Sequence, residues 1–386
     1  MLDDVFVIDA VSHGYHLAPE VAVPSGMGPA WNPESWVAAG YAVFRNTLPE
    51  GSVLDFQRWM RGADPELIAH ALFAESYTDA TIYHEVPLDR MFYEDGTSPI
   101  WCGAQMRERW PSRVELYGGV SPYRPDALDR VDMLVDEYGV KGIKMYPVDL
   151  VDGRVVPIDM ADPEVCFPVY ERARERGVKI IAIHKAIPVG PTPIKPLRVD
   201  DMDGAALAFP DLVFEIVHGG FAFLEETALQ VSCFPNIVIN LEGTTLFLPK
   251  APRRFAEIIG SLLASGGEDR IMWASGCMAG HPQPMLDAFW NLEMPEDLVE
   301  GYGYPPLTKE IKRKILGLNA ADIIGLDIEE MKRGMAGDEF SARQELAPMW
   351  EGNRAFDLSA YRAAAVKGYA SIPVVPGQTD GTVPVS

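Results

Sequence analysis

Short runs of apolar, often β-branched residues alternate with amphipathic stretches, and this alternation restricts the fold more than any other feature. The runs predict strands at residues 5–9, 79–83, 114–119, 141–145, 178–183, 212–217, 236–241 and 270–274. Helices are expected at 126–138, 163–176, 201–208, 222–232, 252–264 and 308–317. Several runs are continuously apolar, as strands buried on both faces of a parallel sheet should be. Eight strands with intervening helices predict an α/β fold, a (β/α)8 TIM barrel.

Two long segments interrupt the alternation. Residues 14–78 follow the first strand and residues 85–110 follow the second, so both should reach the barrel mouth and form lid insertions over a pocket. We therefore predict one TIM-barrel catalytic domain over residues 1–339. The remaining segment, 340–386, is expected to be a C-terminal arm, either on the surface or in a homo-oligomer contact.

The charge and cysteine content restrict the partners and the compartment. The chain has 56 acidic and 33 basic residues, a formal net charge of -23, which argues against nucleic acid because phosphate binding needs clustered Lys and Arg. It contains no apolar run of about 18 residues, so no membrane span is predicted. The N-terminus lacks the basic region of a secretory signal, and four cysteines are too few and too widely spaced for a disulfide framework. We expect a cytoplasmic protein with a small-molecule ligand.

Histidines gather at the ends of the predicted strands. Only one of the seven, His70, lies inside a helical stretch and is expected to be structural. Strand ends converge at the mouth of a TIM barrel, and neutral imidazole is a favoured metal ligand. Glu242 adds a carboxylate at the end of the seventh strand. The pattern predicts a metal site built from His13, His16, His184, His218, Glu242 and His281.

The order of the motifs resembles that of amidohydrolase-like barrels, especially their decarboxylase and hydratase branch. VIDAVSH, at residues 7–13, is similar to the D-x-H-x-H motif of the first strand. GIKMYP resembles the fourth strand, AIHK and EIVHGG match the histidines of the fifth and sixth, and WASG with KILGLNAADIIGL resembles the eighth strand and closing helix. The resemblance covers roughly residues 5–330 and implies a metal-dependent enzyme.

Two positions depart from that family pattern. Val11 stands where the family has histidine, and Gly276 follows Ser275 where the family has aspartate. The missing aspartate normally binds metal and handles the proton of the attacking water, so the hydrolytic machinery is incomplete. Six other donors remain, more than the three that a catalytic zinc requires. This altered set resembles a small branch of amidohydrolase-like barrels that are non-heme diiron monooxygenases of natural-product pathways.

That second resemblance implies a monooxygenase with two iron ions, which hydroxylates an apolar substrate bearing a carboxylate or a CoA thioester. An external electron donor would then be needed, because the chain shows no reductase module. The alternative is a mononuclear zinc or manganese hydrolase or decarboxylase that acts on a small aromatic acid. A third reading is a degenerate barrel that serves as a binding or scaffolding protein.

Three more residues are candidates for catalytic roles. Asp9 is expected to face the barrel interior, as a ligand or as the partner that orients an imidazole. His84 lines the pocket or makes a hydrogen bond in the core. Lys144 is an internal ion-pair partner or, as in other amidohydrolase branches, a carbamylated bridge between metals.

Overall fold

The computed structural model describes residues 2, 4–18, 21–22, 33–88, 91, 93, 95–189, 192–341 and 345–350. Eight parallel strands form one sheet in the order β1-β2-β3-β4-β7-β8-β9-β10. Their bounds are β1 (Ile8–Ser12), β2 (Ala80–His84), β3 (Val114–Gly119), β4 (Gly142–Met145), β7 (Ile180–His184), β8 (Val213–Val217), β9 (Ile237–Asn240) and β10 (Ile271–Met272).

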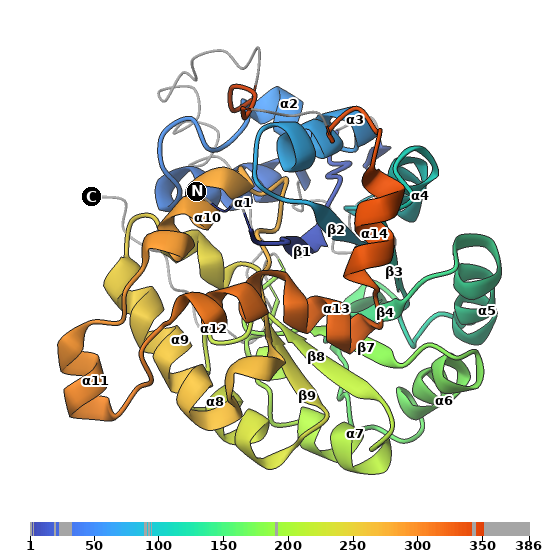
Figure 1. Ribbon diagram of the computed structural model, residues 1–386. Helices are drawn as coiled ribbons and strands as arrows, with labels where there is room; N and C mark the ends of the chain where they lie inside the picture. Colours follow the sequence, from blue (N-terminus) through green and yellow to red (C-terminus); the bar gives the residue numbers. More distant parts are fainter. Residues whose placement is uncertain are drawn as a thin grey trace, which may run out of the picture.

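Backbone contacts between the first and last strands close the sheet into a barrel. The Ala10 N–H donates to Trp273 O at 2.9 Å, and Ser12 forms a parallel bridge with Cys277. Helices surround the strands on the outside (Figure 1). The predicted (β/α)8 TIM barrel is confirmed.

The helices that follow strands β2 to β10 pack around the barrel. They are α4 (Ile100–Arg109), α5 (Ala127–Tyr138), α6 (Phe167–Glu175), α7 (Met202–Ala208), α8 (Leu224–Cys233), α9 (Pro252–Gly266), α10 (Pro282–Asn291), α11 (Glu296–Tyr302), α12 (Lys309–Arg313), α13 (Asn319–Ile324) and α14 (Ile328–Met335). Alternate strand residues face these helices, so Phe214 of β8 packs edge-on against Tyr170 of α6 at 5.4 Å. Local signals set the ends: α5 stops at Gly139, whose φ of 52° suits glycine.

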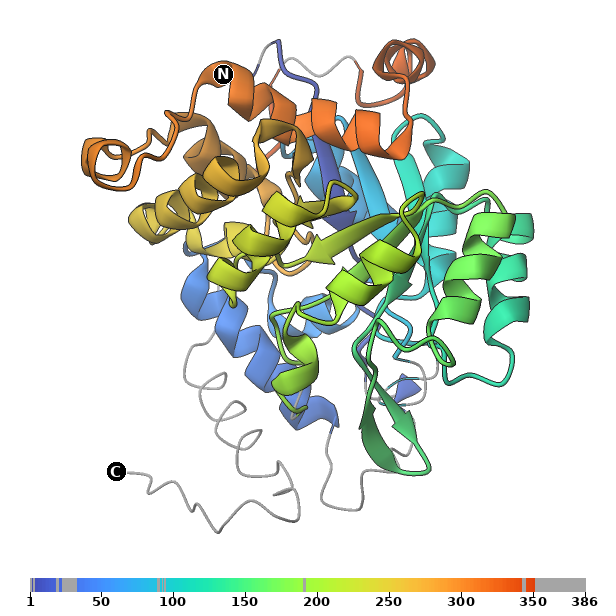
Figure 2. The same ribbon diagram turned by 90° about the horizontal axis from the view of Figure 1, so that it is seen from below.

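The connection after β1 adds three helices at the barrel mouth, α1 (Pro33–Thr47), α2 (Phe56–Met60) and α3 (Pro65–Ala69). A hairpin of β5 (Val148–Val151) and β6 (Arg154–Pro157) follows β4. The blue helix α1 and the green hairpin lie at one end of the barrel, and the orange α13 lies at the other (Figure 2). Asp152 and Gly153, both with positive φ, form the hairpin turn, and this Asp-Gly pair is the sequence signal that predicts such a turn.

Two expectations differ from the structure. The first strand runs from Ile8 to Ser12 instead of 5–9, because Ile8 pairs with Ala80 of β2. The second insertion, 85–110, is not a plain loop, since α4 begins directly after Pro99.

The C-terminal segment lies only partly within the described residues. Its described part contacts the barrel, where Ala347 N–H donates to Ala74 O at 2.9 Å, whereas residues 351–386 of the predicted arm lie outside the described residues. The domain boundary at 339 stays a prediction. In the part of the chain that the structure describes, no helix has the length and apolar character needed to cross a membrane.

Candidate metal centre

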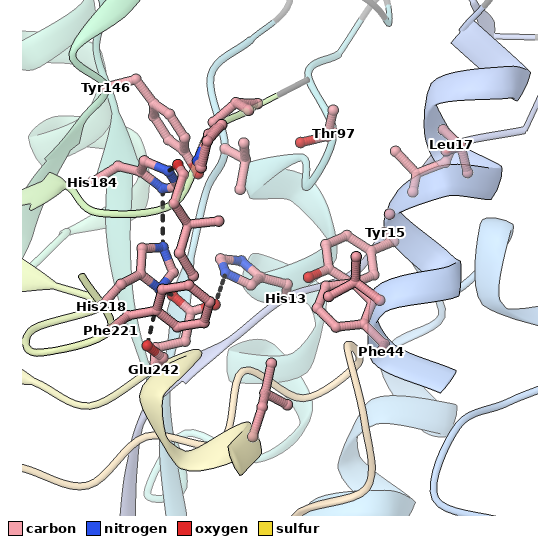
Figure 3. Close-up of a pocket in the computed structure, with 18 of the residues that line it drawn as sticks. His13, Tyr15, Leu17, Phe44, Thr97, Tyr146, His184, His218, Phe221 and Glu242 are labelled. Carbon is pink, nitrogen blue, oxygen red and sulfur yellow. Dashed lines mark hydrogen bonds and ion pairs between the residues drawn. The ribbon is translucent and has the colours of Figure 1, made fainter. Parts of the chain in front are cut away.

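A cavity of about 240 Å³ lies at the mouth of the barrel, where the strands end. One side of it carries His13, His184, His218 and Glu242, and the opposite side is apolar (Figure 3). His184 is the last residue of β7, and the other three follow the ends of β1, β8 and β9. The structure therefore brings together four of the six predicted metal ligands.

The three histidines are oriented by the backbone. Each donates one ring N–H to a carbonyl oxygen: His13 Nδ1 to His84 O at 2.9 Å, His184 Nε2 to Ile187 O at 2.6 Å, and His218 Nδ1 to Glu242 O at 2.9 Å. A carbonyl only accepts, so in each ring the nitrogen that faces the carbonyl carries a proton. In a neutral His184 or His218 the other ring nitrogen is left with a lone pair.

These lone pairs face other acceptors. His184 Nδ1 and His218 Nε2 lie 3.1 Å apart, and His13 Nε2 lies 3.4 Å from Glu242 Oε1. Burial, and then the neighbouring groups His218 and Lys144, hold the pKa of His184 well below its usual value. Burial also lowers the pKa of His218. Both rings are neutral at pH 7, so no hydrogen lies between their facing nitrogens.

Glu242 supplies the negative charge of the cluster. Burial favours its protonated form, but His218, His13 and Lys144 outweigh burial and hold its pKa well below the usual range. The group is a carboxylate, 7% exposed, with its oxygens 3.4 Å from His13 Nε2 and His218 Nδ1. His218 itself has a φ of 68°, a conformation that is strained for a residue with a side chain.

The chemistry of this donor set fits a divalent cation. Two nitrogens each about 2.1 Å from one ion, at about 90° to 109°, are about 3.0 to 3.4 Å apart, which is the separation of both facing pairs. A cation would relieve the contact between lone pairs, and imidazole with carboxylate suits zinc or manganese. Within the described residues, however, no group of three or more His, Cys, Asp or Glu side chains is arranged so that it could hold a metal ion without some movement of these side chains.

Glu242 also occupies the space beside Gly276, where the family pattern has aspartate. A Cβ atom added at Gly276 would lie 3.0 Å from Cγ and Oε1 of Glu242. The φ of Gly276 is 66°, which favours glycine. An acidic side chain thus lies beside Gly276, but it comes from the segment after β9 instead of the segment after β10.

Two tyrosines complete the site, and the sequence analysis missed both. The ring of Tyr146 stacks on His184 with centroids 4.5 Å apart, and Tyr15 stacks on His13 at 5.7 Å. Tyr146 is two residues beyond Lys144, so strand periodicity already placed it on the interior face. No comparable signal marked Tyr15, which follows β1 in a loop.

His16 and His281 do not join the cluster. His281 uses both nitrogens elsewhere, because Nδ1 accepts from Gln283 N at 3.2 Å and Nε2 donates to Glu75 at 3.0 Å. The ring of His16 lies edge-on to Trp101 at 5.8 Å, and neither histidine lines the cavity. The structure does not bring these two rings to the cavity, so metal binding by His16 and His281 stays a prediction that the described site does not support.

Asp9 does not line the cavity, although the sequence analysis expected it to face the barrel interior. Ala10 and Val11 both belong to the cluster that fills the interior, and the register of β1 changes between Asp9 and Ser12, so strand alternation does not fix the face on which Asp9 lies. Its carboxyl group accepts hydrogen bonds from the N–H and hydroxyl of Ser275 and from Val11 N–H. Burial raises its pKa to about 7.

His84 and Lys144 are fully buried in the barrel and do not line the cavity. Neither ring nitrogen of His84 has a hydrogen-bond partner; the ring stacks on Tyr117 at 4.5 Å, and burial keeps its pKa well below the usual value. Burial likewise lowers the pKa of Lys144 to about 8, opposed by the charges of Glu242 and Glu215. Their catalytic roles stay predictions.

The fold and this cluster define a TIM-barrel protein with a buried imidazole–carboxylate site at its strand ends. The sequence profile of the Amidohydrolase family matches residues 56–326, and the chain belongs to this family. The match starts after His13 and therefore does not include the first strand. No match was found among curated proteins.

Solved structures show the same fold. An uncharacterized TIM-barrel protein from Bordetella bronchiseptica is 14% identical with a TM-score of 0.55, covering 83% of this chain and 99% of its own. A dihydroxybenzoic acid decarboxylase from Polaromonas sp. JS666, with manganese and 2-nitroresorcinol, is 14% identical with a TM-score of 0.53, covering 84% and 98%. An amidohydrolase from Burkholderia multivorans with zinc is 14% identical with a TM-score of 0.51, covering 83% and 100%.

The expectation of a diiron monooxygenase is wrong. The chain belongs to the Amidohydrolase family, and this match supports the hydrolase or decarboxylase alternative instead. The prediction rested on six donors, and His16 and His281 do not line the cavity. Without a monooxygenase, the predictions of an iron cofactor, a CoA-linked substrate and an external electron donor have no support.

Proposed function

We propose that this protein is a metal-dependent decarboxylase that acts on a small aromatic acid and uses one zinc or manganese ion. The observation that carries the proposal is the pair of facing lone pairs on His184 and His218, with His13 and the Glu242 carboxylate beside them at the polar end of the cavity. Such an arrangement is unfavourable unless a cation lies among these atoms.

The four side chains that would hold the ion are His13, His184, His218 and Glu242. A bound zinc or manganese ion supplies a Lewis acid that polarises a substrate oxygen. Manganese in the Polaromonas decarboxylase and zinc in the Burkholderia protein support this choice of metals. Glu242 takes the place of the aspartate that Gly276 cannot provide.

The remaining cavity residues bind the ring and exclude water. Decarboxylation breaks the bond between a ring carbon and the carboxylate, releases CO₂, and leaves an electron pair on the carbon, which then takes a proton. Moving the substrate carboxylate from water into this largely apolar cavity favours its loss as neutral CO₂. Tyr146 and Tyr15 fix the imidazole planes of His184 and His13 by stacking.

A hydrolase is the second candidate, and Glu242 favours it. A buried carboxylate 3.4 Å from His13 Nε2 has the charge that a general base for water requires. The two candidates differ in product, because hydrolysis adds water to the substrate whereas decarboxylation releases CO₂.

The test uses the full chain, stripped of metal and reloaded with zinc or manganese, and a panel of hydroxybenzoates under anaerobic conditions. We expect CO₂ release without O₂ or a reductant, and no release from the metal-free protein. Incorporation of ¹⁸O from labelled water into an ester or amide substrate, without CO₂, would instead establish the hydrolase. Turnover that requires O₂ would contradict both.

A further inference from the structure

The cavity is polar at one end only. Glu242 is the one Asp, Glu, Lys or Arg that lines it among the described residues, and the imidazoles of His13, His184 and His218 lie next to it. Lysine and arginine do not occur in the described lining. A second ionised group on a ligand would be buried without a partner, which is strongly unfavourable.

The apolar end is built by the insertion after β1. Val37, Gly40 and Phe44 line the cavity from α1 and are spaced three and four residues apart, so they share one helix face. Trp59 of α2 continues this wall. The insertion, and not the barrel, therefore sets the shape of the space opposite the metal centre.

Gly40 is the one position on this face without a side chain. A Cβ atom built there meets no atom of the described residues within 4 Å, and the residue lies inside a 15-residue helix. Glycine in a helix interior is less stable than alanine by about 0.5 to 1 kcal/mol. Neither the backbone conformation nor a neighbouring described atom requires glycine at this position. The absence of a side chain at Gly40 does, however, leave free space in the cavity.

We propose that Gly40 determines substrate specificity: it leaves room for an uncharged, apolar substituent on the aromatic acid, at the end of the ring away from the carboxylate. Tyr15, Phe44 and Trp59 offer aromatic surface on this side, and Val43, which is 49% exposed, lies at the rim. The inference rests on the proposed function for the position of the substrate carboxylate. The substrate class is then an alkyl- or aryl-substituted aromatic monoacid.

Isothermal titration calorimetry of the zinc-loaded full chain with benzoate and its 4-methyl, 4-propyl and 4-pentyl derivatives tests this proposal. Each methylene should raise the affinity about fourfold until the space is filled. Terephthalate, with a second carboxylate, should bind at least about tenfold more weakly than 4-methylbenzoate. Equal binding of terephthalate, or no gain along the series, would overturn the inference.

The substitution Gly40→Leu should fill the space, so the ratio of 4-pentylbenzoate to benzoate affinity should fall at least about tenfold. Gly301→Leu is the matched control, because Gly301 also lies in a helix and its Cβ would meet nothing within 4 Å, but it is exposed. Melting temperatures verify that both variants fold. An unchanged ratio in Gly40→Leu overturns the inference. If the affinity rises along the series and Gly40→Leu abolishes this rise, the inference is supported. The absence of CO₂ release from every ligand would then contradict only the proposed reaction.

Discussion

In the proposed metal centre the carboxylate follows a different strand from the aspartate of the family pattern. Glu242 follows β9, and its side chain occupies the space beside Gly276, which follows β10. The sequence indicated both halves of this exchange, the missing aspartate and the added glutamate. It did not show that they are neighbours, because their contact depends on how the barrel closes.

The positions of Glu242 and Gly276 predict that a substitution at one can compensate for the loss of zinc affinity caused by a substitution at the other. Glu242→Ala should weaken zinc binding by about tenfold or more, because one charged ligand is lost. Adding Gly276→Asp to that variant should restore part of the affinity, since aspartate tolerates the positive φ and the Glu242 side chain no longer blocks its Cβ. Gly276→Asp alone should destabilise the protein. Competition with a zinc chelator measures the affinities, and equal affinity in the single and double variants would contradict the exchange.

Asp9 predicts a pH dependence of stability. Burial raises its pKa in the folded protein from 3.8 to about 7, so the folded state holds a proton that the unfolded state has released. The stabilising contribution is complete below pH 3.8 and is lost as the pH rises through about 7. Between pH 5.5 and 8 the loss is about 2 kcal/mol.

The variant Asp9→Asn should lack this loss, because its amide keeps an acceptor for Ser275 N–H and adds a donor for the hydroxyl. Urea denaturation of both proteins at pH 5.5 and 8 measures the difference. An identical pH dependence in the two proteins would show that Asp9 does not titrate in this range.

The helix α10 is held by a buried contact that the sequence analysis took for metal ligation. His281 caps this helix and donates to Glu75, which also lies near His70 Nδ1 at 3.1 Å and accepts from Trp350 N–H at 2.6 Å. Glu75 thus links α10, the segment after α3 and Trp350 of the C-terminal segment. His281 was predicted as a ligand from its position after β10 alone.

We predict that His281→Ala lowers the free energy of unfolding by about 2 kcal/mol, because a hydrogen bond to a buried carboxylate is lost. Its zinc content should remain that of the unaltered protein. His218→Ala is the contrasting variant and should lose zinc. Thermal denaturation and metal analysis of the two purified proteins measure both effects, and loss of zinc from His281→Ala would restore this residue to the metal site.

Regular periodicity predicted the barrel well, because strands buried on both faces and amphipathic helices carry direct sequence signals. It placed His184 and Glu242 correctly at strand ends. It failed for Asp9, since β1 begins three residues later than predicted and its register changes between Asp9 and Ser12. Loop residues such as His16 have no periodicity, so their direction depends on tertiary contacts alone.

An ion pair joins the segment after α14 to the residue that precedes β3. Arg113 precedes β3, and its guanidinium makes a bidentate pair with Asp338, near the end of the described chain, while contacting the rings of Phe73 and Phe340 at 5.2 and 5.6 Å. The Arg113 side chain is 6% exposed. An unpaired charge at this depth is strongly unfavourable.

Asp338→Ala should therefore lower the free energy of unfolding by about 3 kcal/mol. The control is Asp297→Ala, which breaks the exposed bidentate pair with Arg253 and should leave the melting temperature nearly unchanged. Thermal denaturation compares the two variants. Equal effects would mean that the Arg113 pair does not anchor the C-terminal segment.

The central claim is that one divalent ion is bound by the side chains at four strand ends around the cavity. Mass-spectrometric metal analysis after equilibrium dialysis of metal-free protein against zinc counts the bound ions directly. We predict one zinc per chain in the unaltered protein and none in His184→Ala or His218→Ala. Two ions per chain, or one ion retained in either variant, would contradict the account.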